Sequence, residues 1–438
     1  MFFRVLASDL SGLGPEERFV LAAFVMQFNG AGPVQVAVRE IAEKLSVSPH
    51  QWIRAADRLV EAGFLLATVV PQPRGRPARS YEISPRLTLT KDVTDCSLVN
   101  RKIIQRLLSF RNILESESGV STSVRGVGGR VGYKTPPVRG GEGRLSVSNR
   151  LLLAVLVLHA NELGTVRDVS MLKLRKMTGI DGVNLKPRLR RLARMGFIRR
   201  LVPGVSRSIF AGAKVSTTYF LNFNHPQLVP AADATAVLVV CENRGSRREV
   251  LTSAAPLIVL NFLQHLKDEA LDLLCLRLAE YVAYMLGQYW LELGRGQRSE
   301  LESALLYRVS ADFQRPVGDA ADELKITESD WSIVLDHFCW LALERAESIK
   351  SRLEYWIAAE ISVSKAELIP SPYKKGVQAT TILLKHAPFP SVRCLAIWDV
   401  REGFCVPYKK EADVPVEIRW DLGLLTDLSQ GRQKLRCF

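Results

Sequence analysis

The 438-residue sequence lacks most signals of membrane, secreted or metal-binding proteins. Its longest purely apolar run near a helix, Leu151 to Leu158, has eight residues, far short of the ~20 that span a bilayer. The start, MFFRVLASDL, has no basic segment before a long apolar run, so we expect no secretory signal and no membrane partner. The seven cysteines are scattered and never form a CxxC pair. This favours reduced thiols in the cytoplasm over disulfides or a thiolate zinc site.

Catalytic and cofactor motifs are also missing. The sequence contains no G-x-S-x-G, H-E-x-x-H or kinase pattern. The glycine-rich run at 126–132 has no preceding strand and lacks the Lys-Ser/Thr ending of a phosphate loop. His337 and Cys339 are two positions apart and cannot share a helix face. We therefore expect no enzyme, no cofactor and no metal site.

Basic residues are abundant but unevenly distributed. The chain has 59 Lys and Arg against 45 Asp and Glu, a formal net charge of +14. Residues 1–230 contribute 34 basic and 16 acidic residues, whereas residues 231–438 contribute 25 and 29. The most basic segment is 146–230, with 14 basic and 3 acidic residues. This distribution predicts a polyanionic partner for the first half only.

One pattern of helices and strands occurs twice, at 15–83 and at 146–223. The first copy predicts these elements: a helix from Pro15, a short strand at 34–38, a helix at 39–45, a helix capped by Ser48, and strands at 65–70 and 80–83. The second copy has the same order, and a shift of 133 residues pairs Trp52 with Leu185. Because Pro187 is tolerated only in a first helical turn, we expect Asn184 rather than Asp181 as the cap of the third helix.

Helix, turn, helix and a two-stranded ribbon resemble the winged-helix form of the helix-turn-helix, over about 150 of the 438 residues. In that family the third helix enters the major groove, and the tip of the ribbon, the wing, touches the flanking backbone or minor groove. The resemblance implies a tandem winged helix-turn-helix protein that binds double-stranded DNA.

The expected fold is mainly α with small β-wings, in four parts. These are a winged-helix domain at 1–90, a helix with a flexible basic linker at 91–145, a second winged-helix domain at 146–230, and a mostly helical α+β domain at 231–438. The segment 115–145 is rich in Gly, Ser, Pro and Arg, which predicts two tethered, independent winged units. The last domain carries apolar helical patterns such as Ile333, Val334, Phe338 and Leu341, which favour a homo-oligomer or a protein partner.

In each copy, the candidate DNA contacts are the polar residues of the third helix that lie opposite its apolar stripe, together with the basic residues of the wing. In the first copy they are His50, Gln51, Arg54, Arg58, Arg74, Arg76 and Arg79. In the second copy they are Lys186, Arg188, Arg190, Arg191, Arg194, Arg199, Arg200, Arg207 and Lys214. In the first copy, Asp57 and Glu61 on the third helix carry negative charge that repels phosphate. The matching positions in the second copy are Arg190 and Arg194. We therefore expect the second copy to supply more of the affinity.

The leading hypothesis is a sequence-specific DNA-binding regulator of transcription in the cytoplasm, associated with the nucleoid. An alternative is a replication initiator of plasmid or phage type, since such initiators also resemble paired winged helices. The long linker argues against it, because the two units of an initiator usually pack as one block. A further alternative is an enzyme or scaffold that acts through 231–438 and is delivered to DNA by the first half.

Overall fold

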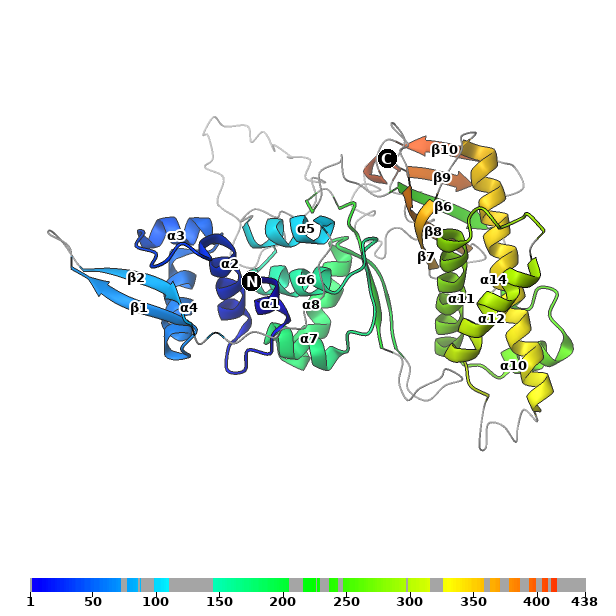
Figure 1. The fold of residues 1–438 in the computed structure, drawn as a ribbon, viewed down its shortest axis with the longest axis horizontal. Coiled ribbons are helices and arrows are strands. Elements are labelled where there is room, and N and C mark those ends of the chain that lie inside the picture. Colours follow the sequence, from blue (N-terminus) through cyan, green and yellow to red (C-terminus); the bar gives the residue numbers. More distant parts are fainter. Residues whose placement is uncertain are drawn as a thin grey trace, which may run out of the picture. The chain divides into compact units, whose positions relative to one another are not determined.

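The computed structural model shows a mixed α/β protein with small sheets, divided into two compact units (Figure 1). The described residues are 2–71, 77–85, 87, 98–109, 145–204, 216–225, 227–228, 236–242, 247–296, 298–315, 326–357, 363–370, 378–386, 394–398, 404–408 and 411–415. Unit 1 comprises Met1–Glu162, Val169–Ile198 and His225–Pro230. Unit 2 comprises Leu163–Asp168, Arg199–Asn224 and Ala231–Phe438.

The first copy of the repeat lies entirely in unit 1. Its elements, with one preceding helix, are α1 (Phe2–Ala7), α2 (Pro15–Phe28), α3 (Val38–Lys44), α4 (Pro49–Glu61), β1 (Leu65–Val70) and β2 (Ala78–Ile83). The predicted start of α4 is confirmed, because Ser48 Oγ accepts from Gln51 N at 3.2 Å and Gln51 Oε1 accepts from Ser48 N at 3.0 Å. The expected strand at 34–38 is reduced to one antiparallel bridge between Val34 and Tyr81.

The remaining helices of unit 1 are α5 (Leu98–Ser109), α6 (Val147–Leu158), α7 (Met171–Thr178) and α8 (Gly182–Arg194). The predicted cap at Asn184 is wrong. Asp181 caps α8, and its Oδ1 accepts from Asn184 N at 2.9 Å. Pro187 lies inside the helix. Proline removes only the bond to the Val183 carbonyl near the helix start, whereas the cap satisfies an otherwise unpaired N–H and adds a turn.

The helices of both copies pack together within unit 1, where α2 contacts α5 and α6. Arg150 of α6 is 2% exposed and donates to the carbonyls of Leu107 (2.7 Å) and Ser46 (3.0 Å). Its guanidinium lies 4.6 Å from the centre of the Phe19 ring on α2. Burial lowers the pKa of Arg150 to about 10. One buried cation therefore joins elements of both copies.

Arg18 makes a second connection of the same kind. It is 5% exposed and donates to the carbonyls of Leu10 (2.6 Å), Leu13 (2.9 Å) and Lys176, the last on α7. The expected division into independent units at 1–90 and 146–230 thus differs from the structure, in which these helices form one unit. Most of the predicted linker, 110–144, lies outside the described residues.

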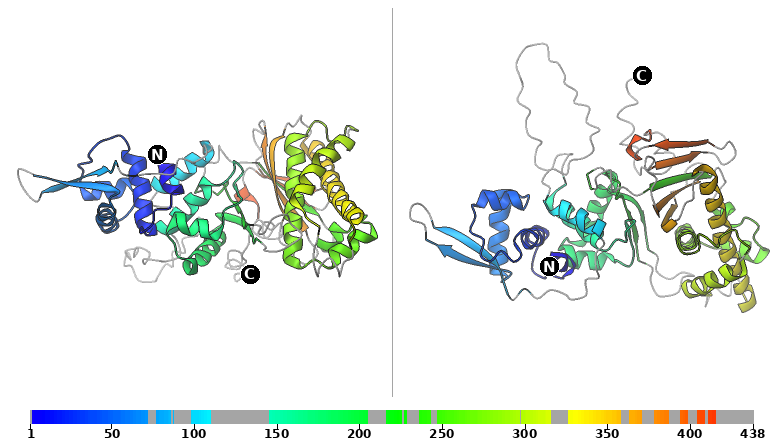
Figure 2. Two further views of the ribbon diagram at one scale, coloured as in Figure 1. Left: turned by 60° about the horizontal axis from the view of Figure 1, so that its bottom comes forward. Right: turned by 45° about the horizontal axis from the view of Figure 1, so that its top comes forward.

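The large part of unit 2 combines a five-stranded sheet with helices. Its elements are β6 (Ala236–Glu242), α9 (Arg247–Leu251), α10 (Leu257–Gln264), α11 (Asp268–Gln288), α12 (Arg298–Asp312), α14 (Glu328–Ile357), β7 (Val363–Pro370), β8 (Gln378–His386), β9 (Cys394–Trp398), β10 (Phe404–Tyr408) and the 3₁₀-helix η2 (Glu411–Asp413). The strand order is β10-β9-β6-β8-β7, and only the β6–β9 pair is parallel. Figure 2 shows the helices on one side of this sheet.

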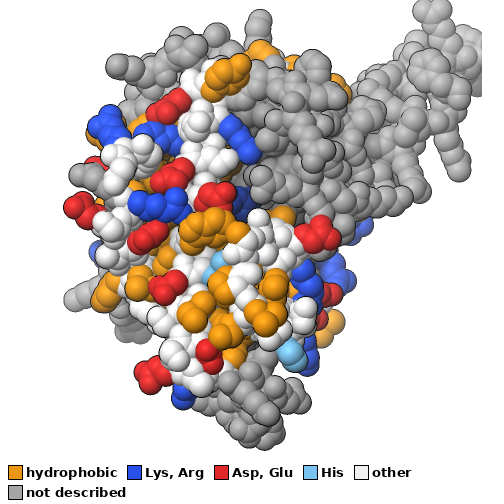
Figure 3. Space-filling view, turned by 90° about the vertical axis from the view of Figure 1, so that its right-hand side faces the viewer, with side chains coloured by type: hydrophobic (Ala, Val, Ile, Leu, Met, Phe, Trp, Pro, Cys, Tyr) orange, Lys and Arg blue, Asp and Glu red, His pale blue; other side chains and the backbone are white. Residues whose placement is uncertain are grey.

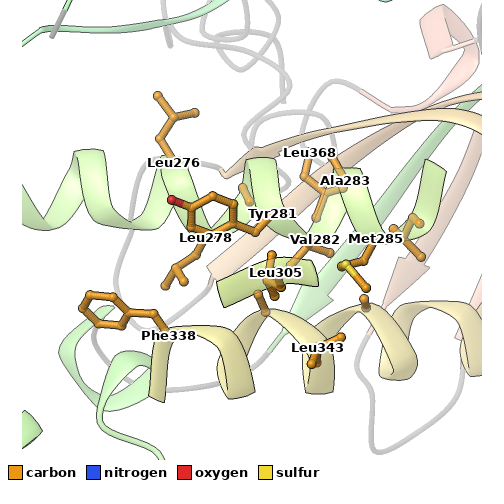
Figure 4. Packing of buried hydrophobic residues seen from close by; sticks show 14 of the residues in the cluster. Leu276, Leu278, Tyr281, Val282, Ala283, Met285, Leu305, Phe338, Leu343 and Leu368 are labelled. Atoms are coloured by element: carbon orange, nitrogen blue, oxygen red, sulfur yellow. The ribbon is translucent and has the colours of Figure 1, made fainter. Parts of the chain in front are cut away.

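The core of unit 2 is formed by α11 and α14 together with α10, α12 and the strands β7 and β8 (Figure 4). Tyr281 and Met285 of α11 and Phe338 of α14 are among its members, each 3% exposed or less. The apolar helical pattern around Val334 and Phe338 is confirmed as part of α14. Ile333, which belongs to the same pattern, is 38% exposed. No helix in the described part of the chain has the length and apolar character needed to cross a membrane.

Unit 2 also contains a small three-stranded sheet from the second copy of the repeat. Its strands are β3 (Thr165–Val166), β4 (Ile198–Val202) and β5 (Thr218–Leu221), in the order β3-β5-β4. Arg199 of β4 forms a bidentate pair with Glu411 of η2, with both distances at 2.6 Å. Arg167 pairs with Glu280 of α11 at 2.9 Å and with Glu367 of β7 at 2.5 Å. These ion pairs attach the small sheet to the C-terminal part of the chain.

Candidate nucleic-acid interface

Helix α8 has the two faces that the sequence predicts. Leu185, Leu189 and Leu192 are at most 3% exposed, and their spacing of four and three places them on one side of the helix. Lys186, Arg190 and Arg194 recur every four residues, so they form a stripe along another side. All three are exposed. The leucine face fixes the helix in unit 1, and the basic stripe faces outward.

Two of these cations have no carboxylate partner. Within the described part of the chain, neither Lys186 nor Arg190 forms an ion pair or a side-chain hydrogen bond, and no acidic residue occurs in the sequence between Asp181 and Asp233. Asp181 itself caps the helix. Hydrogen bonds from the backbone and side chain of Asn184 lower the pKa of Asp181. The outer side of α8 therefore keeps its positive charge.

Helix α7 adds cations that the sequence analysis did not nominate. Lys173, Arg175 and Lys176 are exposed, and α7 contacts α8. A Cβ built on Gly182 would lie 3.6 Å from guanidinium atoms of Arg175, which places Arg175 beside the first turn of α8. Their signal was present in the sequence as three basic residues in four positions. We define Lys173, Arg175, Lys176, Lys186, Arg190 and Arg194 as the α7–α8 cationic surface.

Arg188 and Arg191 differ from this exposed stripe. Arg188 is half-buried, and its Nη1 donates to Asn149 Oδ1 at 2.8 Å and lies 3.4 Å from Ser146 Oγ. Ser146 caps α6, so Arg188 connects α8 with the start of α6. Arg191 is also half-buried. These two candidates are less accessible to DNA than Lys186, Arg190 and Arg194.

In the first copy, the described arginine candidates are paired with carboxylates. Arg54 pairs with Glu16, Arg58 Nη1 lies 3.1 Å from Glu61 Oε2, and Arg79 Nη1 donates to Asp57 Oδ1 at 2.8 Å. The Gln51 side chain accepts from the Ser48 backbone, so part of its hydrogen-bonding capacity is used within the capping box. His50 is exposed. The surface of α4 thus presents ion pairs rather than excess positive charge.

The wings are only partly visible. Arg74, Arg76, Arg207 and Lys214 lie outside the described residues. Arg200 is half-buried. The prediction that Arg199 is presented to DNA on the second wing is wrong: its side chain is 5% exposed and is held by Glu411. A buried bidentate arginine–carboxylate pair has no charge to offer to phosphate.

The outer face of unit 2 has a different chemical character. In Figure 3, hydrophobic side chains gather in one part of this face, and acidic and basic side chains surround them. Large exposed apolar residues of the unit include Leu257 of α10, Tyr307 of α12 and Tyr355 of α14. Among the described residues, no group of His, Cys, Asp or Glu has the arrangement of a metal site.

Comparison with known proteins adds no relative: no protein-family model, curated protein or solved structure matches the chain.

Proposed function

We propose that the chain is a sequence-specific double-stranded DNA-binding protein with two winged helix-turn-helix motifs, in which α8 is the principal recognition helix. Both copies have the order helix, helix, helix, strand, strand, with an isolated bridge in the first copy and the short strand β3 in the second between the first two helices. In both, the first strand position pairs with the last strand: Val34 with Tyr81, and Val166 with Tyr219. This strand pairing supports the winged-helix assignment beyond the order of the elements.

The observation that carries the proposal is the exposed stripe Lys186, Arg190 and Arg194, on a helix whose opposite side is fixed by buried leucines. An α-helix fits the major groove, where base edges present a distinct pattern of donors and acceptors. Arginine and lysine also neutralise backbone phosphates, which supplies much of the affinity. A stripe of the length of α8 can therefore contact both bases and backbone.

The direct test is a selection of DNA sites from a random duplex library by the full-length chain. We expect an enriched sequence, and an affinity for it that falls steeply with salt. About six phosphate contacts correspond to a slope near −5 in a plot of log K against log salt. Recovery of no common sequence would contradict specific reading, and an affinity that ignores salt would contradict the proposed cationic surface.

Between the two biological roles, the packing of unit 1 favours a replication initiator of plasmid or phage type over a regulator with two tethered heads. Arg150 and Arg18 join elements of both copies through buried hydrogen bonds. Two recognition helices held in this way require DNA half-sites at one fixed spacing. Footprinting on duplexes with varied spacing tests this, and strand opening beside the site separates an initiator from a transcriptional regulator.

The predicted partner surface in 231–438 remains part of the proposal. Exposed apolar residues such as Tyr307, which is 81% exposed, suit a contact with a second chain or another protein. Unit 2 includes residues from outside 231–438, so the mass in solution should be measured on the full chain. A monomer at tens of micromolar would argue against a homo-oligomer.

For a DNA-binding protein of this kind we propose a location at the nucleoid in the cytoplasm.

A further inference from the structure

A cavity in unit 2 lies between α11, α14 and the segment around the end of α9. Its empty volume, including the part open to solvent, is about 730 Å³. The DNA-binding proposal makes no use of this cavity, which is built only from residues of unit 2.

One wall of the cavity is apolar. Leu278 and Val282 of α11 are buried, and Figure 4 shows them on the side of α11 that faces α14. Leu251 at the end of α9 and Leu341 on α14 extend this wall. Aliphatic side chains on three segments can cover the hydrocarbon part of a ligand, which gains about 25 cal/mol for each Å² of apolar surface removed from water.

The other wall is a polar face of α14. Arg345, Ser348 and Arg352 follow one another at intervals of three and four residues, so they lie on the same side of the helix. Over seven residues the helix rises about 10 Å, which separates the two arginines by two turns. Glu344 also lines the cavity, and its side chain is exposed. Because two arginines and one glutamate line the cavity, its charged side chains sum to one net positive charge.

Arg345 has unused hydrogen-bonding capacity. Its Nη2 donates to Thr380 Oγ1 of β8 at 2.5 Å. Its Nε is buried and has no hydrogen-bond partner among the described residues. A buried donor without a partner costs free energy, and a carboxylate or phosphate oxygen is the acceptor that best matches a guanidinium. This donor therefore points to an anion rather than to a neutral or cationic ligand.

We propose that this cavity is a binding site for a small amphipathic organic anion, whose acidic group contacts Arg345 and Arg352 and whose hydrocarbon part lies against Leu278 and Val282. Arg345 is held in place by Thr380, and Ser348 supplies a hydroxyl donor between the two arginines. The site is independent of the proposed DNA interface, because all of its residues belong to unit 2.

The test measures binding to the full-length chain by calorimetry, with octanoate, 4-phenylbutyrate and hexyl phosphate as anionic probes. Octanol and octylammonium are the matched neutral and cationic probes. We expect at least one anion to bind with a Kd below about 1 mM, and at least tenfold more tightly than octanol or octylammonium. Equal binding of the three eight-carbon probes would overturn the anion assignment, and so would failure of all three anions to bind.

Substitutions of the lining arginines test where in the cavity the anion binds. Arg345→Gln and Arg352→Gln should each weaken binding of the best anion by about tenfold or more. The control Arg308→Gln should leave it unchanged, because Arg308 is exposed on α12 against the Tyr284 ring and does not line the cavity. Alkylation of Cys275, a half-buried residue of the lining, should slow when the anion is present. Unchanged binding in both arginine variants, or no protection of Cys275, would contradict the site.

Discussion

The two copies of the repeat have the same order of helices, but the first is electrically balanced where the second is strongly positive. Helices α3 and α4 span 38–61, and a shift of 133 residues places this window on 171–194, the range of α7 and α8. The first window contains four basic and four acidic residues, and the second contains eight basic and one acidic. The buried positions of Trp52, Ala56 and Leu59 are apolar in both copies, because packing requires it, whereas exposed positions are free to diverge.

The difference also appears in the contacts. The arginines of α4 and β2 are engaged by Glu16, Glu61 and Asp57, but Lys186 and Arg190 of α8 have no such partners in the described part of the chain. Removing an exposed ion pair changes stability by about 0–1 kcal/mol, so pairing on α4 is not needed for folding. The ion pairing instead lowers the net positive charge on the surface of α4. The described surface of the first copy is charge-balanced, and that of the second carries excess positive charge.

The largest loss of DNA affinity is expected when α8 receives the acidic residues of α4. Arg190→Asp with Arg194→Glu places carboxylates at the positions that correspond to Asp57 and Glu61. We expect affinity for the selected DNA site to fall about a thousandfold, or about 4 kcal/mol, because two contacts are lost and repulsion is added. Fluorescence anisotropy at fixed salt measures the loss. A change of less than tenfold would mean that this stripe does not face DNA.

A smaller effect is expected when the connection between the copies is cut. Arg150→Met removes the donors to the Leu107 and Ser46 carbonyls and leaves both carbonyls without this partner. Breaking a buried charged hydrogen-bond network costs about 2–4 kcal/mol of unfolding free energy. Urea denaturation measures that cost. Footprints of the variant should tolerate changes in half-site spacing that the parent rejects, and an unchanged spacing requirement would show that other contacts hold the two copies.

The caps of α4 and α8 should contribute equally to the unfolding free energy, although the charges on the two helix surfaces differ. Asp181→Ala and Ser48→Ala each remove a side chain that accepts a backbone N–H at the start of α8 or α4. Each should lower the unfolding free energy by about 1 kcal/mol. Denaturant midpoints measure this change. No loss in Asp181→Ala would contradict the cap position and favour Asn184 as the cap.

An effect of similar size is expected from a pH dependence in the second copy. Burial, with the nearby charge of Lys173, lowers the pKa of His159 to about 4 from its ordinary value of 6.5. The unfolded chain therefore binds the proton first, and stability is lost as pH falls from 6.5 towards 4. Because the ring is only partly buried, we expect a loss on the order of 1 kcal/mol. His159→Gln should reduce this dependence in denaturation curves from pH 7 to pH 4.

The sequence predicted the elements whose signals are local. The Ser48 cap, the inward leucines of α8 and the greater positive charge of the second copy can all be inferred within a few turns of chain. It could not predict contacts between distant segments. Arg199 looks like a wing residue until Glu411 meets it 212 positions later, and Arg150 gives no periodic sign that it joins two copies. The cap at Asp181 was missed because the cost of Pro187 was overestimated.

We expect α8, and not α4, to supply the electrostatic affinity for DNA. The most direct measurement compares two matched double variants of the full-length chain on one duplex over a range of salt: Lys186→Gln with Arg190→Gln, and Arg54→Gln with Arg58→Gln. Both remove two positive charges. The α8 pair should weaken binding about a hundredfold and reduce the salt slope by about two, whereas the α4 pair should change affinity less than about threefold. Equal losses, or a larger loss from the α4 pair, would contradict the account.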